Sequence, residues 1–222
     1  MKTTPVDDDL QTIYHRRFAG KGGYRQQVWK VLLSDFFQRF VPETGAVLDL
    51  GCGYGEFINL VKGPTRYAMD LNPAAGRYLN PDVRWFQQDC STRWPLEDET
   101  LGLVFTSNFF EHLPDKRGLL ETLKEAHRCL RPGGRLVALG PNIKYVGGAY
   151  WDFWDHHVAL TEASLAEVLE SLGFKMERVV PRFLPYSMST GRQYPLVFLR
   201  LYLQLPVAWR FFGRQFLVVG RK

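Results

Sequence analysis

Residues 47–57, V-L-D-L-G-C-G-Y-G-E-F, decide the fold. An apolar run that holds one carboxylate, Asp49, is followed at once by glycines at the alternate positions 51, 53 and 55. This pattern is typical of a buried strand that turns sharply and leaves its bare backbone open to a neighbour. The stretch therefore predicts a strand, a tight turn and a ligand lying against that turn.

Short apolar runs alternate with helical patterns along the rest of the chain. Residues 26–40 carry apolar side chains at the i, i+3, i+4 spacing of an amphipathic helix. Strands are predicted at residues 46–50, 66–70, 83–87, 101–107, 135–140, 175–180 and 215–219. Further helices are predicted at residues 55–62, 74–79, 118–130 and 162–172. This alternation predicts βαβ units and an α/β fold with a parallel sheet covered on both faces.

Polar side chains follow successive strands, where the ligands of such sheets bind. Asp70 lies at the tip of the second strand, and a carboxylate there commonly accepts from both hydroxyls of an adenosine ribose. Asp89 follows the third strand and would accept from an exocyclic amine such as that of adenine. Asn108 and Phe109 follow the fourth strand, at the mouth of the pocket. Together these strand ends predict one adenosine-containing ligand.

The successive motifs resemble those of the class I S-adenosylmethionine-dependent methyltransferases. The matching motifs are V-L-D-L-G-C-G-Y-G-E-F, A-M-D-L-N-P, Q-Q-D-C, S-N-F-F-E-H-L and L-R-P-G-G-R-L, within residues 46–140. The resemblance implies a Rossmann-like three-layer sandwich around a seven-stranded, mostly parallel sheet with an antiparallel last strand. Residues 215–219 are the candidate for that last strand, and S-adenosylmethionine is the implied cofactor.

The resemblance also implies roles for the matching residues around the methionine part of the cofactor. Asp49 would lie near its amino group, while Asn108 and Phe109 would stand beside the sulfonium. The loop beneath it would consist of Gly51, Cys52, Gly53 and Gly55.

On the adenosine side, the resemblance implies that Asp70 holds the ribose hydroxyls. Leu71 and Cys90 would flank the adenine ring, and Asp89 would meet its amine. A dinucleotide is the rival ligand, but its G-x-G-x-x-G fingerprint needs a glycine where this chain has Glu56.

A general base is needed only if the methyl acceptor must lose a proton, as a hydroxyl does. His112, His156 and His157 are the candidate catalytic residues, although each has a purely structural alternative. Asp152 and Asp155 lie near the histidine pair, but no second cluster of ligands accompanies them, so no metal site is predicted.

An aromatic segment, residues 145–157, follows the fifth strand, where methyltransferases of this class usually build part of the acceptor pocket. Its rings would stack on a sugar face or enclose an apolar chain, or else pack beneath the loop. The rings in question are Tyr145, Tyr150, Trp151, Phe153 and Trp154.

Two segments outside the predicted core carry basic and apolar residues. Residues 14–25 are a candidate lid over the cofactor, with Arg25 reaching the cofactor carboxylate. Residues 194–212 are too interrupted by arginine and proline to span a membrane, and they favour an amphipathic helix on the bilayer surface. A lid over the acceptor and a dimer surface are the open alternatives for the second segment.

Charge and cysteine content limit where the protein works. Nine of the 28 lysine and arginine residues lie in residues 171–222, where Glu177 is the single acid, which suggests an anionic partner or surface. The three cysteines form no C-x-x-C pair, and the first ten residues lack the apolar region of a secretory signal. We therefore predict a cytoplasmic protein. A further prediction is that it binds peripherally to the inner face of the membrane.

These observations divide the chain into four parts and predict an enzyme. The parts are residues 1–45 (lid and first helix), 46–182 (methyltransferase core), 183–213 (insertion) and 214–222 (last strand). The predicted reaction is direct methyl transfer to a small molecule or glycan, including a lipid-linked one, at a hydroxyl. The alternatives are an RNA or protein methyltransferase and a non-catalytic cofactor-binding adaptor. No nucleic-acid-binding module is recognisable, so a nucleic acid is not the expected partner.

Overall fold

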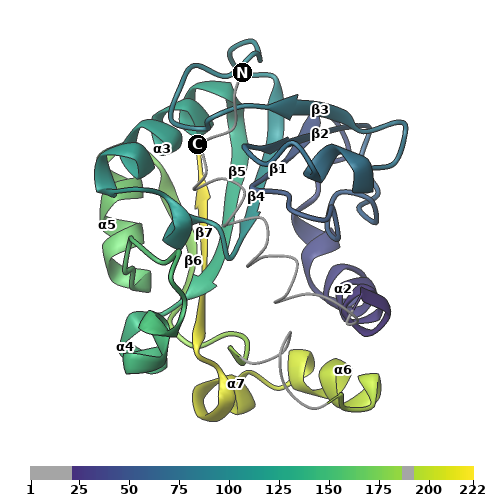
Figure 1. Ribbon diagram of the computed structural model, residues 1–222, viewed down its shortest axis with the longest axis vertical. Coiled ribbons are helices and arrows are strands. Elements are labelled where there is room, and N and C mark those ends of the chain that lie inside the picture. Colours follow the sequence, from purple (N-terminus) through teal and green to yellow (C-terminus); the bar gives the residue numbers. More distant parts are fainter. Residues whose placement is uncertain (1–21, 187–192) are drawn as a thin grey trace.

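A single seven-stranded sheet organises the chain in the computed structural model, which describes residues 22–186 and 193–222 (Figure 1). The strands run in the order β3-β2-β1-β4-β5-β7-β6, and β7 is antiparallel to both of its neighbours. The strands are β1 (Ala46–Leu50), β2 (Thr65–Asp70), β3 (Arg84–Gln87), β4 (Leu101–Ser107), β5 (Leu130–Pro141), β6 (Lys175–Val180) and β7 (Gln215–Arg221). The predicted α/β sandwich with an antiparallel last strand is confirmed.

Helices cover both faces of this sheet, as Figure 1 shows. One apolar cluster joins one face of the sheet to α3 and α5, and the other joins the opposite face to α2, η1 and the turn after β1. The α-helices are α2 (Gly22–Asp35), α3 (Lys116–Cys129), α4 (Ile143–Val146), α5 (Glu162–Ser171), α6 (Leu196–Gln204) and α7 (Pro206–Phe212). The 3-10 helices are η1 (Phe37–Phe40), η2 (Ala75–Tyr78), η3 (Phe110–His112) and η4 (Gly147–Asp152).

The helix predicted at residues 26–40 is displaced and interrupted. It begins earlier, as α2, and ends at Asp35, because Phe36 leaves the helical region at φ −136° and ψ −59° before η1 continues. Residues 22–25 of the predicted lid thus belong to α2, and residues 14–21 of that lid lie outside the described part of the chain.

The helix predicted at residues 55–62 is wrong. These residues form a series of turns, because Gly55 has a left-handed φ of +71° and Gly63 and Pro64 end the segment only a few residues later. The site therefore has no helix N-terminus after β1. The helix predicted at residues 74–79 is only the short 3-10 helix η2.

The insertion and the N-terminal helix pack on each other at one end of the sheet. Rings from both segments form a cluster in which Phe36 lies 4.5 Å from Phe183, and Phe183 lies 4.9 Å from Trp209, measured between ring centroids. Arg200 of α6 forms a 3.2 Å ion pair with Asp35 of α2. Residues 183–213 are thus anchored to the segment that precedes the core.

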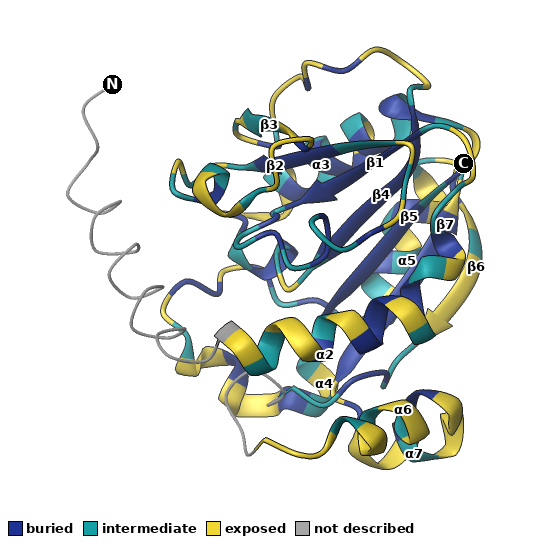
Figure 2. Cartoon of the chain, turned by 90° about the vertical axis from the view of Figure 1, so that its right-hand side faces the viewer, coloured by how far each residue is buried: buried dark blue, intermediate teal, exposed yellow. Residues whose placement is uncertain are grey.

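Burial follows this arrangement (Figure 2). The central strands are buried, whereas α6 and α7 are largely exposed. Within residues 22–186 and 193–222, no helix combines the length and the apolar character needed to cross a membrane.

Candidate functional site

A cleft of about 270 Å³ lies beyond the carboxyl ends of β1 and β4. Eight of the predicted site residues line it: Arg25, Asp49, Gly51, Cys52, Gly53, Asn108, His112 and His156. Seven predicted site residues lie outside the cleft lining: Gly55, Asp70, Leu71, Asp89, Cys90, Phe109 and His157. Strands that lie apart in the sequence therefore bring one subset of the predicted residues together.

The glycine turn after β1 forms the floor of one end of the cleft. Gly51 has a φ of +69°, and a Cβ atom there would lie 2.2 Å from the ring of Phe109. Gly53 has a φ of +51°, but nothing lies within 4 Å of a Cβ placed on it. Gly51 is thus required by packing against Phe109, whereas Gly53 leaves bare backbone open to the cleft.

Asp70 holds this turn in place. Its Oδ2 accepts from the amide of Gly53 at 2.8 Å, and its Oδ1 accepts from the amide of Asn72 at 2.9 Å. Burial raises the pKa of Asp70, although these backbone hydrogen bonds oppose the rise. The sequence predicted a ribose-binding carboxylate here, and the second role, positioning the glycine turn, was missed.

Asp49 brings a buried carboxyl group to the cleft wall. It is 4% exposed, and its pKa is raised well above the ordinary value by burial and then by the nearby charges of Glu56 and Asp70. Such a group favours a cationic ligand, because a positive charge restores the ionised form.

Arg25 lies in the cleft lining with partners of its own. It forms an ion pair with Glu56, and its guanidinium carbon lies 4.9 Å from the centre of the Tyr54 ring. A role toward the cofactor carboxylate stays a prediction.

The adenosine side of the predicted site is an open surface. Leu71 is 65% exposed. Asp89 is also exposed, and its Oδ1 accepts from the amide and the hydroxyl of Ser91. Cys90 is buried with its Sγ 3.3 Å from Oγ1 of Thr122, so its side chain is directed into the core rather than toward the cleft. The adenine and ribose assignments stay predictions.

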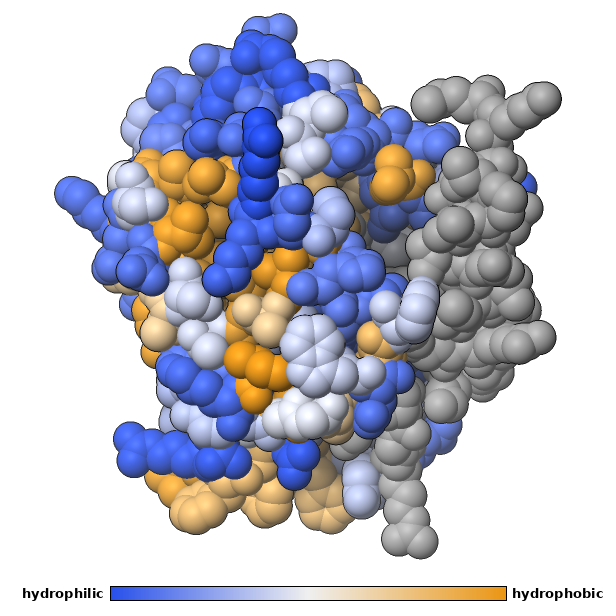
Figure 3. Space-filling view, turned by 60° about the vertical axis from the view of Figure 1, so that its left-hand side comes forward, coloured by the Kyte–Doolittle hydropathy of each residue, from blue (hydrophilic) through white to orange (hydrophobic). Residues whose placement is uncertain are grey.

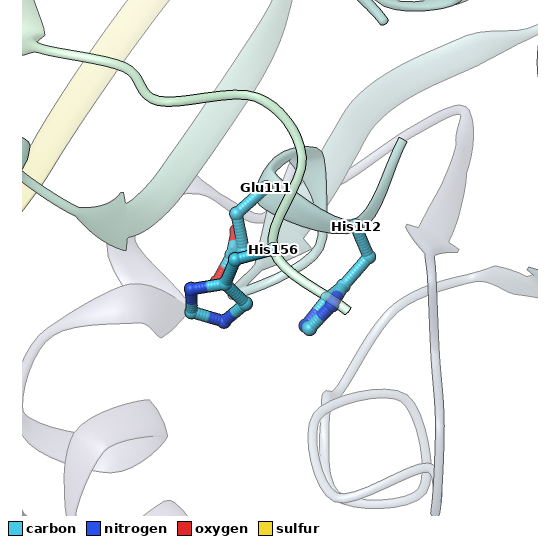
Figure 4. A group of neighbouring side chains, drawn as sticks. All are labelled: Glu111, His112 and His156. Carbon is cyan, nitrogen blue, oxygen red and sulfur yellow. The ribbon is translucent and has the colours of Figure 1, made fainter. Parts of the chain in front are cut away.

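At its other end the cleft is lined by Glu111, His112 and His156, which point toward one another in Figure 4. Burial raises the pKa of Glu111 to about 7, against the lowering effect of His112. Burial by itself would lower the pKa of His112, but its hydrogen bond to Asp155 and the charges of Glu111 and Asp155 raise it overall. The sequence analysis had not selected Glu111, although it directly precedes His112 after β4.

Asp155 and two aromatic rings orient these histidines. Nδ1 of His112 lies 2.9 Å from the backbone oxygen of Asp155 and 3.1 Å from its Oδ2. His156 packs between Tyr150 and Phe153, with ring centroids 4.6 and 4.9 Å away. The aromatic segment therefore positions His156, one of the two histidines that line the cleft.

The structure separates the predicted histidine pair. His157 is exposed and lies outside the cleft lining, while its backbone amide donates to the carbonyl oxygen of Glu111 at 2.8 Å. The backbone of His157 thus joins the loop to η3. The position of its side chain outside the cleft does not support the predicted catalytic role.

Of the five aromatic residues predicted for the acceptor pocket, Phe153 is the one that lines the cleft. Tyr150 is fully buried, and Trp151 and Trp154 are exposed. Tyr145 packs under the guanidinium of Arg182 instead.

The sequence analysis also missed Tyr186 and Gln215, which complete the acceptor end of the cleft. Gln215 is 5% exposed; its Nε2 donates to the carbonyl oxygen of Pro185, and its Oε1 has no hydrogen-bond partner within the described residues. It is the first residue of antiparallel β7 and therefore lies at the same edge of the sheet as the carboxyl ends of the parallel strands, so a search limited to residues that follow strands misses it.

Sheet order, glycine turn and cleft together define the Rossmann-like methyltransferase architecture. A family model described as "Methyltransferase domain" matches residues 22–179, and the chain belongs to this family. S-adenosylmethionine is the cofactor of the class I members. The open backbone of Gly53 and the carboxylates of Asp49 and Glu56 fit the methionine half of that molecule, which carries an ammonium and a sulfonium.

Several solved structures share the fold. One is a SAM-dependent methyltransferase from Archaeoglobus fulgidus, with a TM-score of 0.70, 20% identity and coverage of 96% of this chain and 99% of that one. Another is a chain from the complex between the Haloferax volcanii Trm112 methyltransferase activator and a methyltransferase, with a TM-score of 0.67, 18% identity and coverage of 100% and 99%.

An uncharacterised protein of Methanocaldococcus jannaschii, MJ0638, is 32% identical over 101 residues. The match covers 43% of this chain and 40% of that protein, so the chain spans about two fifths of the length of this relative.

Proposed function

We propose that the protein transfers a methyl group from S-adenosylmethionine to a hydroxyl of a small molecule or glycan. The observation that carries this proposal is one cleft with two chemically different ends. A glycine turn and the carboxyl groups of Asp49 and Glu56 stand at one end, and a group of side chains that can exchange a proton stands at the other.

When bound, the cofactor supplies an electrophilic methyl group on sulfur. The work of the protein is then to align the acceptor, exclude water and let the hydroxyl proton leave. Glu111 and His112 suit the last task because both hold perturbed pKa values beside the cleft. Phe153 and Tyr186, whose ring centroids lie 5.9 Å apart, offer an apolar wall for the acceptor.

The reaction is tested with a panel of hydroxyl-bearing small molecules, glycans and lipid-linked glycans and with a labelled methyl group. We expect one class to be methylated, and we expect His112→Asn to lose about 100-fold or more in kcat. Calorimetry should show unchanged cofactor affinity in that variant. Tight cofactor binding without transfer to any acceptor would instead favour a cofactor-binding adaptor.

The surface of α6 and α7 supports acceptors presented at a membrane. Eight large apolar side chains on or beside these helices are each at least 50% exposed: Tyr194, Val197, Phe198, Leu201, Leu205, Val207, Phe211 and Phe212. Figure 3 shows pale orange side chains at the lower end of the molecule, where Figure 1 places α6 and α7. Arg210 and Arg214 are exposed beside them.

Apolar side chains with flanking arginines match the interfacial region of a bilayer that contains anionic lipid. Cosedimentation with phosphatidylglycerol-containing vesicles tests this part of the proposal. Binding should fall strongly in a Phe211→Ser, Phe212→Ser double variant and on replacement of the anionic lipid by phosphatidylcholine. A concentration-dependent dimer that the same double variant abolishes, without vesicle binding, would assign the surface to self-association.

A further inference from the structure

Three side chains at the acceptor end of the cleft have the composition of a metal site. One ligand atom from each of Glu111, His112 and His156 can be chosen so that all three lie within 4.8 Å of one another. Figure 4 shows the three side chains meeting from two directions, with Glu111 and His112 on η3 and His156 on the loop after η4. All three also line the cleft, so a ligand from solvent can reach them.

A second layer of contacts orients these groups as it does in metalloproteins. Nδ1 of His112 faces two acceptors of Asp155, its backbone oxygen and its Oδ2, so Nδ1 carries the proton and Nε2 carries the lone pair. A carboxylate that fixes the tautomer and orientation of a histidine in this way is characteristic of metal-ligating imidazoles. The ring of His156 is held between Tyr150 and Phe153.

This end of the cleft also brings two buried carboxyl groups close together. Glu111 is 4% exposed and Asp155 is 6% exposed. The rings of His112 and His156 are next to each other, with their centroids 5.0 Å apart. Two carboxyl groups buried next to two imidazoles gain from a bound positive charge, which offsets the cost of burying the carboxylates in ionised form.

We propose that Glu111, His112 and His156 bind a divalent transition-metal cation at the acceptor end of the cleft. Two imidazoles and one carboxylate suit Mn²⁺, Fe²⁺ or Zn²⁺ better than Mg²⁺ or Ca²⁺, which prefer all-oxygen ligands. Metal–ligand distances of about 2.0–2.2 Å require the donor atoms to approach one another to about 3–3.5 Å, a small rotation of the side chains. Because the three residues line the cleft, an acceptor that enters it can reach the cation.

The consequence for catalysis rests on the proposed function. A hydroxyl oxygen of the acceptor would coordinate the cation, which would lower the pKa of that hydroxyl, so that its proton passes to solvent. With the cation bound, Glu111 and His112 would assist proton loss as its ligands rather than as direct proton acceptors. The new O–C bond then forms as the C–S bond of the sulfonium breaks, and the neutral thioether leaves. This assigns to the acceptor a hydroxyl that can coordinate a metal, with a second oxygen next to it favoured by chelation.

Titration of the unaltered 222-residue chain with Mn²⁺ at neutral pH, without cofactor or acceptor, tests the site itself. Calorimetry and the loss of the free Mn²⁺ electron paramagnetic resonance signal report binding directly. We expect one ion per chain, with an affinity that falls about 10–100-fold in Asp155→Asn and at least as far in Glu111→Gln and His156→Ala. The matched control is His157→Ala, next in sequence and outside the cleft, which should bind Mn²⁺ like the unaltered chain.

Equal Mn²⁺ affinity in the unaltered chain, Glu111→Gln and His156→Ala would overturn the proposal, as would the absence of saturable binding. Circular dichroism spectra identify any variant that fails to fold, and the conservative Glu111→Gln change then decides. Metal binding without methyl transfer to any hydroxyl acceptor would keep the cation site and reject the proposed function, whereas transfer that is fully retained in chelator would reject the metal-dependent step alone.

Discussion

The two ends of the cleft are built in different ways. The end lined by Asp49, Gly51 and Gly53 comes from one continuous stretch of chain. Backbone hydrogen bonds help to hold this stretch, such as those from the amides of Gly51 and Cys52 to the carbonyl oxygen of Met69. The other end collects single side chains from η3, the loop after η4, residue 186 and the start of β7.

This difference separates stability from specificity. A site made of backbone tolerates little change in the residues that shape it, because φ values and close packing fix it. A site made of side chains that reach in from separate elements can be altered one position at a time while the sheet stays intact. Substitutions at the first end should therefore affect folding and cofactor binding, and those at the second end should affect the acceptor step.

The largest effect is expected at Gly51. Gly51→Ala forces a side chain into a left-handed φ of +69° and places a Cβ 2.2 Å from the ring of Phe109. Strain and overpacking together should lower the free energy of unfolding by about 3 kcal/mol or more. Urea denaturation followed by circular dichroism measures the loss.

Gly53→Ala is the matched comparison, because its φ is also positive but its Cβ meets open space. We expect a smaller loss of stability, about 1 kcal/mol, together with weaker cofactor binding. Equal destabilisation by both changes would mean that the ring of Phe109 moves aside freely, and the packing argument for Gly51 would be lost.

Asp70 comes second in expected effect. Asp70→Ala removes the predicted ribose partner and also the acceptor of the Gly53 amide. Cofactor affinity should fall by roughly 2 kcal/mol, or about 30-fold, in calorimetry. An unchanged affinity would show that the ribose assignment is wrong and that the turn holds without this carboxylate.

These first predictions concern the end of the cleft where Asp49, Gly51 and Gly53, all selected from the sequence, are part of the lining. The glycine turn, Asp49 and the strand ends follow from local rules, since each strand end is marked by a change from apolar to polar residues. The helix predicted at residues 55–62 failed for an equally local reason, because its apolar spacing says nothing about the left-handed φ of Gly55.

The acceptor end could not be predicted in the same way. Glu111, His156 and Gln215 line one cleft because the carboxyl ends of β4 and β5 and the start of antiparallel β7 lie at the same edge of the sheet, where the loop after η4 also arrives. Within the aromatic segment, spacing alone did not distinguish buried Tyr150 from exposed Trp154, because short helical turns and loops set the direction of each side chain separately.

The pKa of Asp49 predicts a smaller, pH-dependent effect. Because it is raised in the folded protein, the folded state holds a proton that the unfolded state has already lost above about pH 4. The stability of the cofactor-free protein should therefore decline as the pH rises above that value, by at most about 1.4 kcal/mol per pH unit from this group. The nearby negative charges of Glu56 and Asp70 also raise the pKa of Asp49.

Cofactor binding should have the opposite pH dependence, since the cofactor ammonium favours ionised Asp49. The thermal shift caused by S-adenosylmethionine should grow with pH, and calorimetry in buffers of different ionisation enthalpy should detect proton release on binding. Asp49→Asn should remove that proton release. Identical proton release in the variant would place the titrating group elsewhere in the cleft.

The smallest expected effect distinguishes two buried polar atoms that look alike. Oε1 of Gln215 and Oγ1 of Thr106 both lack a hydrogen-bond partner within the described residues, but only Gln215 lines the cleft. A buried oxygen without a hydrogen-bond donor is costly unless a ligand supplies one, so we infer that Oε1 of Gln215 receives a hydrogen bond from the methyl acceptor.

Gln215→Leu should raise the acceptor KM about 5–10-fold, equivalent to about 1 kcal/mol, with cofactor affinity unchanged. Thr106→Val should leave KM unchanged and preserve or slightly raise stability, because it removes an unsatisfied hydroxyl from the core. If both variants changed KM alike, the effect would come from disturbing the sheet. The inferred hydrogen bond between Gln215 and the acceptor would then be wrong, and so would the distinction between the two ends of the cleft.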